Sequence, residues 1–170
     1  MDSWKSVQIN MKAIPNFLDQ ETFNKIKMCV LNNSFPWYFS PTTGHDNDFS
    51  DFLFSHHLYK EDKQCSQFFN YLITPLISRL NCNYLIRAKA NLYTRKHKHI
   101  KTSFHVDLYD KHTVALFSIN TNNGYTLFEN GKKIPSVENQ MLIFDGSLSH
   151  ASVSPTDASI RVNINMDLMS

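Results

Sequence analysis

Glycine, cysteine and charge of one sign are all scarce in this sequence. Four glycines among 170 residues leave no Gly-rich loop that could hold a phosphate group. The three cysteines, Cys29, Cys65 and Cys82, are odd in number and irregularly spaced, which excludes a disulfide framework and a Cys/His zinc motif and favours reduced thiols. The net charge of +2 at pH 7 gives no overall field toward nucleic acid or an anionic membrane, so any cationic site must be local.

Long apolar runs are lacking as well. No stretch approaches the roughly 20 apolar residues of a membrane-spanning helix, and the first six residues do not resemble a secretory leader. These absences predict a soluble cytoplasmic protein that has no membrane partner. With 42% apolar residues, a chain of this length can bury a substantial core, and we predict a single domain over residues 1–170.

Residue periodicity predicts a helical support in the first half of the chain, over about 14–82. Residues 7–13 alternate like a half-buried strand before it. Asp19 is a suitable N-cap for a helix that buries residues at helical spacing, namely Phe23, Ile26 and Val30. The elements expected next are, in order, an irregular loop over 35–50, a strand over 52–59 and a helix over 61–80 kinked at Pro75.

The second half of the chain is typical of short strands and forms a predicted core over about 84–168. A hairpin turn is expected at residues 120–124, which contain an Asn-Gly pair. Helices followed by many strands predict a mainly β fold with buttressing helices, as a sandwich or barrel. The strands are expected at 84–95, 104–108, 113–120, 125–129, 132–137, 140–145, 150–154 and 159–168.

Three side chains of this half have the chemistry of a metal site. His105 and Asp107 are two residues apart on an expected strand, so both project from the same face. His150 follows a later apolar run and is the best candidate for a third ligand. Two histidines and one carboxylate occupy one face of an octahedron and leave three positions open, as in non-haem Fe(II) oxygenases. A His-x-Asp triplet also arises by chance, so the other residues must support this interpretation.

Polar residues alternate along two further strands. Asn163 and Asn165 share one face of the last strand with Arg161, the only Lys or Arg after His150, while apolar residues occupy the other face. The earlier strand alternates in the same way, with Arg87, Lys89, Asn91, Tyr93 and Arg95 on its polar face. Such rows are often the solvent face of an amphipathic strand. A guanidinium flanked by carboxamides instead favours a pocket in which Arg161 binds a ligand carboxylate in a bidentate manner.

In this order, His105-x-Asp107, His150 and Arg161 resemble the motif of the Fe(II)/2-oxoglutarate-dependent oxygenase superfamily. The resemblance is to the compact prolyl-4-hydroxylase-like kind of phages and marine bacteria, and it covers roughly residues 84–168. It implies a double-stranded β-helix, the cupin-like jelly roll. It also implies that Tyr93 hydrogen-bonds 2-oxoglutarate and that Asn91 and Asn163 line the same cavity. The run Gly124-Tyr-Thr126-Leu-Phe128 is similar to a Gly-Gly-x-Thr-x-Phe motif of the prolyl branch.

The implied activity is hydroxylation of an unactivated C–H bond, with Fe(II), 2-oxoglutarate and O2 as cofactor and cosubstrates and ascorbate as a reductant. The primary substrate would be peptidyl, prolyl-like, or a small molecule, and a phage-encoded protein would act in the host cytoplasm. Loops 35–50 and 95–103 are candidates for a substrate lid, and the sequence leaves the oligomeric state open.

Two other functions are compatible with the sequence. One is oxidative demethylation of an alkylated base in nucleic acid, for which the basic run 95–101 would supply the contacts. Against that branch, Asp167 stands where a second arginine is expected, and no Pro-Gly follows Tyr93. The other is a non-catalytic jelly-roll module that binds a metal ion.

Overall fold

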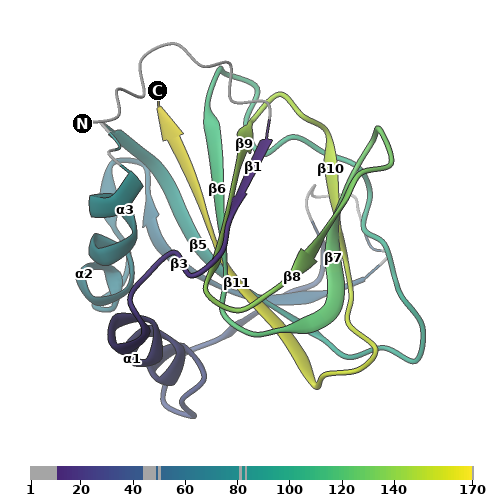
Figure 1. The fold of residues 1–170 in the computed structure, drawn as a ribbon, viewed down its shortest axis with the longest axis horizontal. Coiled ribbons are helices and arrows are strands. Elements are labelled where there is room, and N and C mark those ends of the chain that lie inside the picture. Colours follow the sequence, from purple (N-terminus) through teal and green to yellow (C-terminus); the bar gives the residue numbers. More distant parts are fainter. Residues whose placement is uncertain (1–10, 44–48, 50, 81, 83, 170) are drawn as a thin grey trace.

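The computed structural model describes residues 11–43, 49, 51–80, 82 and 84–169, and these form two antiparallel sheets that face each other (Figure 1). The small sheet has the order β10 (His150–Val153), β7 (Asn122–Phe128), β8 (Lys133–Ser136). The large sheet has the order β1 (Met11–Ile14), β9 (Gln140–Asp145), β6 (Thr113–Ser118), β11 (Ile160–Met169), β5 (Tyr84–Thr94), β3 (Leu53–Lys60), β2 (Tyr38–Ser40), with β4 (Lys63–Gln64) paired to β3. These two facing antiparallel sheets confirm the predicted jelly roll.

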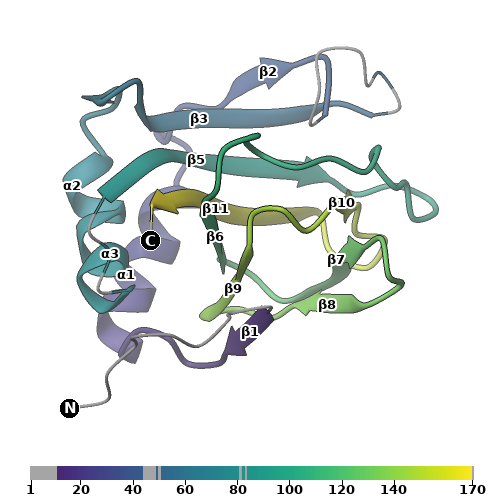
Figure 2. The same ribbon diagram turned by 90° about the horizontal axis from the view of Figure 1, so that it is seen from above.

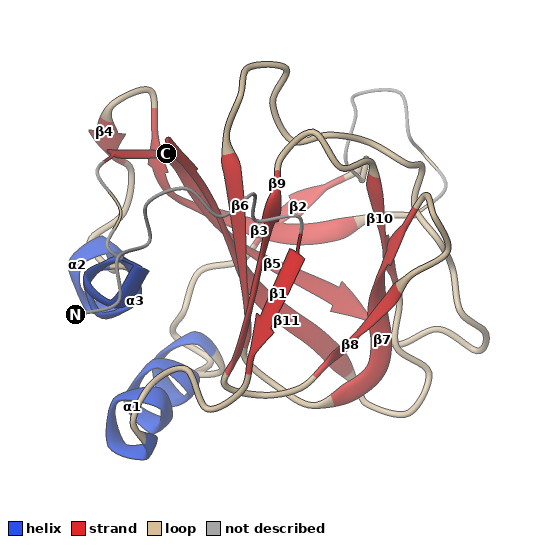
Figure 3. Ribbon diagram, turned by 45° about the horizontal axis from the view of Figure 1, so that its top comes forward, coloured by secondary structure: helices blue, strands red, loops and turns tan. Residues whose placement is uncertain are grey.

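Three helices lie on the side of the large sheet that faces away from the small sheet (Figures 2 and 3). They are α1 (Gln20–Val30), α2 (Phe69–Leu72) and α3 (Thr74–Leu80). The main apolar core fills this helix-to-sheet layer, and Phe117 of β6 packs edge-on against Phe23 of α1 with ring centroids 6.1 Å apart. Between the sheets the apolar cluster is much smaller, which leaves room for a polar pocket.

Helix α1 begins and packs as the sequence predicts. Asp19 is the N-cap, and its carboxylate accepts a hydrogen bond of 2.9 Å from the backbone N–H of Thr22. The buried positions of the helix are Phe23, Ile26 and Val30, which recur at helical spacing. The capped end and the apolar stripe together fix the helix against the sheet.

Asn139 connects the start of α1 to β9. Its backbone has a φ of 56°, and its buried side chain both donates to and accepts from the backbone of Leu18, at 2.8 and 2.9 Å. An Asn139→Ala variant loses both hydrogen bonds and strains a left-handed backbone, so we expect its free energy of unfolding to fall by about 3 kcal/mol in urea denaturation. Asn139→Gly removes the two hydrogen bonds without straining the backbone, so its free energy of unfolding should fall by only about 2 kcal/mol. Equal stability of all three proteins would contradict this role.

The predicted helix over 61–80 is wrong in its first half. Glu61 and Asp62 adopt positive φ values of 53° and 59°, and they form the turn between β3 and β4. The apolar stripe begins only at Phe69, and the helical part is divided into α2 and α3. The tight turn at these two acidic residues therefore ends the helical prediction there, and helix forms only further along the chain.

The predicted strand over 104–108 and the predicted hairpin turn at 120–124 are also wrong. Residues 101–107 are irregular, with isolated bridges at Lys101 and His105 only. Gly124 lies inside β7, and β6 and β7 belong to different sheets, so the connection between them is no hairpin. A bulge in the β7–β8 pairing falls between residues 122 and 125, where glycine is common.

The N-terminal support is less helical than the sequence indicates, because it also contributes β1 to β4 to the large sheet. The predicted loop over 35–50 contains β2, and residues 7–10 of the first predicted strand lie outside the described ranges. In the part of the chain that the structure describes, no helix combines the length and apolar character that crossing a bilayer requires.

Candidate metal centre and cosubstrate pocket

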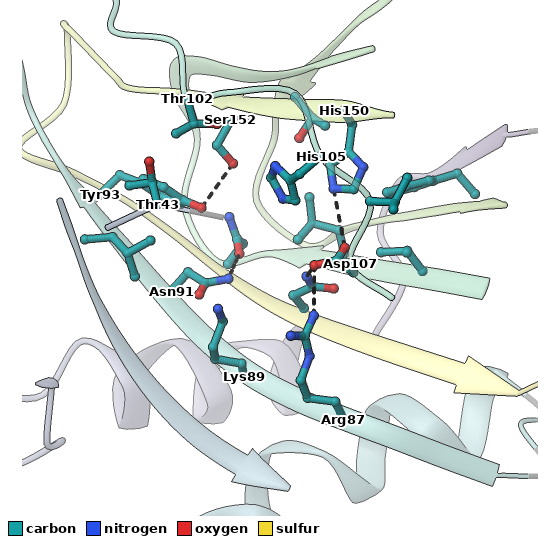
Figure 4. A pocket seen from close by; sticks show the side chains of 18 residues that line it. Thr43, Arg87, Lys89, Asn91, Tyr93, Thr102, His105, Asp107, His150 and Ser152 are labelled. Atoms are coloured by element: carbon teal, nitrogen blue, oxygen red, sulfur yellow. Dashed lines mark hydrogen bonds and ion pairs between the residues drawn. The ribbon is translucent and has the colours of Figure 1, made fainter. Parts of the chain in front are cut away.

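A polar pocket lies between the two sheets, and the inner faces of β5 and β11 form much of its wall (Figure 4). The two predicted polar rows meet there, because β5 and β11 are hydrogen-bonded neighbours. Their register pairs Tyr93 with Arg161, Asn91 with Asn163, Lys89 with Asn165 and Arg87 with Asp167. The polar face of these strands therefore faces the interior and not bulk solvent.

The three predicted metal ligands lie at one end of this pocket. The candidate ligand atoms of His105, Asp107 and His150 are all within 4.8 Å of one another. They converge although residues 104–108 form no strand, because the backbones of His105 and His150 exchange two hydrogen bonds of 2.9 Å. The bridge brings the imidazoles together, with ring centroids 4.8 Å apart, and the bend at Asp107 turns its carboxylate toward them.

Local backbone contacts fix the orientation of both imidazole rings. Nδ1 of His105 lies 3.1 Å from the carbonyl oxygen of Ser103, and Nδ1 of His150 lies 3.0 Å from that of Leu148. Since a carbonyl oxygen only accepts, each Nδ1 carries the proton, and the lone pair for a metal is on Nε2. Phe144 packs edge-on against His150, with ring centroids 4.9 Å apart, and this contact restricts rotation of the imidazole.

The carboxylate of Asp107 has two oxygens in different environments. Oδ1 accepts from the guanidinium of Arg87 at 2.8 Å and from the amide of Asn165 at 3.3 Å. Oδ2 is buried without a hydrogen bond and lies 3.4 Å from Nε2 of His150. Burial alone would raise the pKa of Asp107, but the contacts with His150 and Arg87 outweigh it and hold the pKa well below its usual range. An ionised oxygen left unpaired beside two Nε2 atoms fits a divalent cation.

Arg87 is held in turn by Asp167, with 2.7 Å between Nε and Oδ2. Asp167 is fully buried, and burial together with the charge of Asp107 raises its pKa to about 6, although Arg87 opposes this shift. Its second oxygen lies 4.0 Å from Nε2 of buried His112. This chain of charged groups sets the position of Asp107. Alternation places Arg87 and Asp167 on the polar faces of the paired strands, but no pattern in the sequence predicts this role for them.

Arg161 lies directly behind the pocket wall, where it contacts two of the lining residues, Thr126 and Tyr93, away from the triad. It is 2% exposed, and its guanidinium donates to Ser136 Oγ at 2.7 Å, to Thr126 Oγ1 at 3.1 Å and to the carbonyl of Val153 at 3.4 Å. All three acceptors are uncharged, and within the described ranges no carboxylate contacts it. These bonds use three of its five N–H groups and leave one on each terminal nitrogen. The arrangement suits a bidentate carboxylate ligand.

Tyr93, Asn91 and Asn163 surround the space next to Arg161. The ring of Tyr93 lies 5.3 Å from the guanidinium carbon, and its hydroxyl accepts a hydrogen bond of 3.0 Å from Ser152. Burial raises the pKa of the Tyr93 hydroxyl, so it stays protonated and has a hydrogen to donate. Asn91 donates to Asn163 at 3.1 Å, and Oδ1 of Asn91 is buried without a partner.

The lack of a side chain at Gly124 leaves space for the side chain of Arg161. A Cβ atom at this position would lie 2.9 Å from Cδ of Arg161 and 2.8 Å from the carbonyl oxygen of Val153, closer than side chains pack. A Gly124→Ala variant should therefore displace the guanidinium and weaken 2-oxoglutarate binding by about tenfold to 100-fold, measured by titration with the cosubstrate. Iron affinity should not change, because the triad lies at the other end of the pocket. Loss of both affinities together would indicate general misfolding and contradict the assignment.

Of the two hydroxyl residues that hold Arg161, Ser136 carries no signal in the sequence, whereas Thr126 lies in the Gly-x-Thr-x-Phe run. The basic segment 95–101 is mostly exposed, and Lys96 pairs with Asp51 at 2.6 Å and lies 4.1 Å from the ring centroid of Phe52. The segment is a solvated loop anchored to residues 152–159 by backbone hydrogen bonds.

The fold is that of the 2-oxoglutarate/Fe(II) oxygenases, as comparison with solved structures shows. A prolyl hydroxylase from Trichoplax adhaerens, in complex with a peptide fragment of hypoxia inducible factor, matches with a TM-score of 0.68 and 14% identity over 94% of this chain and 83% of that one. A viral collagen prolyl hydroxylase from Paramecium Bursaria Chlorella virus-1, in complex with 2-oxoglutarate, matches with a TM-score of 0.59 and 11% identity over 94% and 96%.

An epimerase of nogalamycin biosynthesis, in complex with Fe3+, alpha ketoglutarate and nogalamycin RO, matches with a TM-score of 0.67 and 11% identity over 95% of this chain and 79% of that one. No protein-family model and no curated protein matches the sequence. The resemblance seen in the sequence, to the superfamily and to its prolyl-hydroxylase kind, is thus confirmed for the fold.

Proposed function

We propose that this protein is an Fe(II)- and 2-oxoglutarate-dependent dioxygenase that hydroxylates an unactivated C–H bond. The observation that carries the proposal is Arg161, a buried guanidinium without a carboxylate partner among the described residues. It lies against Thr126 and Tyr93, which line the same pocket as the His105, Asp107 and His150 triad. Burying an unpaired charge is costly, so it is retained where a ligand of opposite charge binds. A metal-binding module without a cosubstrate has no need of it.

Nε2 of His105, Oδ2 of Asp107 and Nε2 of His150 would hold the iron and leave three positions open. When bound, iron would couple two reactions. One is the oxidative decarboxylation of 2-oxoglutarate by O2 to succinate and CO2, and the other is the insertion of one oxygen atom into a C–H bond of the substrate. Arg87 and Asn165 would keep Oδ1 of Asp107 away from the metal, because both donate to that oxygen. The chain thus offers the metal one carboxylate oxygen.

The other end of the pocket would orient the cosubstrate. Arg161 would bind the distal carboxylate of 2-oxoglutarate, while Ser136 and Thr126 hold the guanidinium in place. The protonated hydroxyl of Tyr93 would donate to the same carboxylate, and Asn91 would present its amide to the cavity. Anchoring one end of the acid directs its keto end toward the triad.

Hydroxylation of a peptidyl or small-molecule substrate is favoured over demethylation of nucleic acid. Structural neighbours include enzymes with a peptide and with a small molecule in their complexes. Lys96 of the basic loop is already paired with Asp51, and no aromatic residue is interleaved within 95–101 for base stacking. We further propose that residues 1–170 act as one oxygenase domain and that the protein works in the cytoplasm, with its three cysteines reduced.

The proposal is tested by succinate release from 2-oxoglutarate in the presence of Fe(II) and ascorbate. We expect slow release without a primary substrate, none after chelation of the metal, and recovery when Fe(II) but not Zn²⁺ is restored. A purified, folded protein that binds Fe(II) and releases no succinate would contradict the proposed activity.

A further inference from the structure

Lys89 brings an ammonium group into the pocket without a partner of opposite charge. It lies on β5 between Arg87 and Asn91, and Figure 4 shows its side chain projecting into the same space as theirs. Within the described ranges Lys89 has no ion pair and no hydrogen bond, whereas Arg87 is paired with both Asp107 and Asp167. Burial, and then the charge of Arg87, lowers the pKa of Lys89. Such an ammonium is stabilised when an anion binds beside it.

The charges of the proposed reaction complex indicate which kind of group is missing. Arg87, Lys89 and Arg161 are three cations, and the carboxylates that contact them, Asp107 and Asp167, both lie on Arg87. Bound Fe(II) would add two positive charges, and the 2-oxoglutarate dianion bound at Arg161 would cancel two. One positive charge then remains, and Lys89 carries it. Resting on the proposed function, we propose that the primary substrate places a carboxylate against Lys89.

The surroundings of Lys89 favour an anion over an apolar group. His57 of β3 is its register partner, and burial together with the charge of Lys89 lowers the pKa of His57 to about 4, so this imidazole is neutral at pH 7. Two oxygens near Lys89 are buried without hydrogen bonds, namely Oδ1 of its β11 register partner Asn165 and Oδ1 of Asn91, two positions further along β5. An apolar occupant would leave the ammonium of Lys89 and these two oxygens unsatisfied. A polar acid with hydrogen-bond donors would satisfy them.

A carboxylate bound against Lys89 narrows the class of primary substrate. A small carboxylic acid, such as a free amino acid, presents a carboxylate close to the C–H bond that reacts. An uncharged residue in the middle of a peptide does not. The structure therefore assigns the pocket to a small acid.

The test uses the Zn²⁺-substituted protein saturated with 2-oxoglutarate, which is diamagnetic and inactive. Acetate and acetamide, which share a shape and differ in charge, are titrated while the ring signals of His57 are followed by NMR. We expect acetate to give a saturable shift and to raise the pKa of His57, because the bound anion offsets the charge of Lys89. Acetamide should give no saturable shift.

Two variants complete the test. Lys89→Met keeps the length and apolar stem of the side chain but should weaken acetate binding by about tenfold or more, with 2-oxoglutarate affinity nearly unchanged. Lys132→Met removes an exposed lysine and should behave like the unmodified protein. Acetate that binds equally well to the Lys89 variant overturns the inference, and so does a tenfold loss of 2-oxoglutarate affinity, which would assign Lys89 to the cosubstrate. Failure of the unmodified protein to bind 2-oxoglutarate would remove the proposed function and this inference with it.

Discussion

Replacing Asp107 with alanine should lower iron-dependent succinate release by a factor on the order of 10³ or more, because the triad loses its only anionic ligand. Oδ2 of Asp107 is the buried oxygen that faces His150, at 3.4 Å from its Nε2. Iron affinity, measured by anaerobic titration, should fall with activity. Arg87 keeps its pairing with Asp167, so the fold should persist.

A matched control for this variant is Asp110→Ala, which removes an exposed carboxylate three residues away. It should retain full iron affinity and turnover, since the contact of Asp110 with His112 is made by its backbone carbonyl. An Asp107→Ala protein that binds iron and releases succinate at the unmodified rate would refute the metal assignment. Equal losses in both variants would also count against it.

The second large effect is expected at Arg161. An Arg161→Met variant should raise the dissociation constant of 2-oxoglutarate by about 100-fold to 1,000-fold, because a buried, charge-assisted bidentate pair is lost. At the same time its free energy of unfolding without ligand should rise by about 1 to 3 kcal/mol, because a buried guanidinium without a countercharge is replaced by an apolar side chain. Cosubstrate titration and urea denaturation measure the two effects.

Opposite changes in binding and stability separate a ligand-binding role from a structural one. If Arg161 served only to hold β11 against β7 and β8 through Thr126 and Ser136, its removal would lower stability. An Arg161→Lys variant keeps the charge and loses the two-pronged geometry, so an intermediate affinity is expected. Unchanged 2-oxoglutarate affinity in the methionine variant would exclude the assigned role.

The parts of the fold that follow from side-chain alternation could be predicted from the sequence. Arg161 and Asn163 alternate with apolar residues, and so do Asn91 and Tyr93, which fixes the inward face of β11 and β5 once the strands pair. The N-cap Asp19 is a local signal of the same kind. These features depend on neighbours within a few residues in the chain.

The remaining features depend on contacts between distant segments. The spacing of His105 and Asp107 is typical of a strand. Their positions are set instead by an isolated β-bridge between His105 and His150, which belongs to another element. The ion pairs from Arg87 to Asp107 and Asp167 span 20 and 80 residues. Ser136 reaches Arg161 only because the small sheet closes over β11. No local pattern encodes these contacts, since the alternation of a strand does not specify its partner.

The central claim is that one pocket binds a ferrous ion at the triad and 2-oxoglutarate between that ion and Arg161. The most direct test is the visible absorption of the anaerobic protein after Fe(II) and then 2-oxoglutarate are added. A metal-to-ligand charge-transfer band that requires both additions, and that is lost in Asp107→Ala and needs far more cosubstrate in Arg161→Met, is the predicted result. A protein that binds Fe(II) but develops no band at saturating 2-oxoglutarate would contradict the claim.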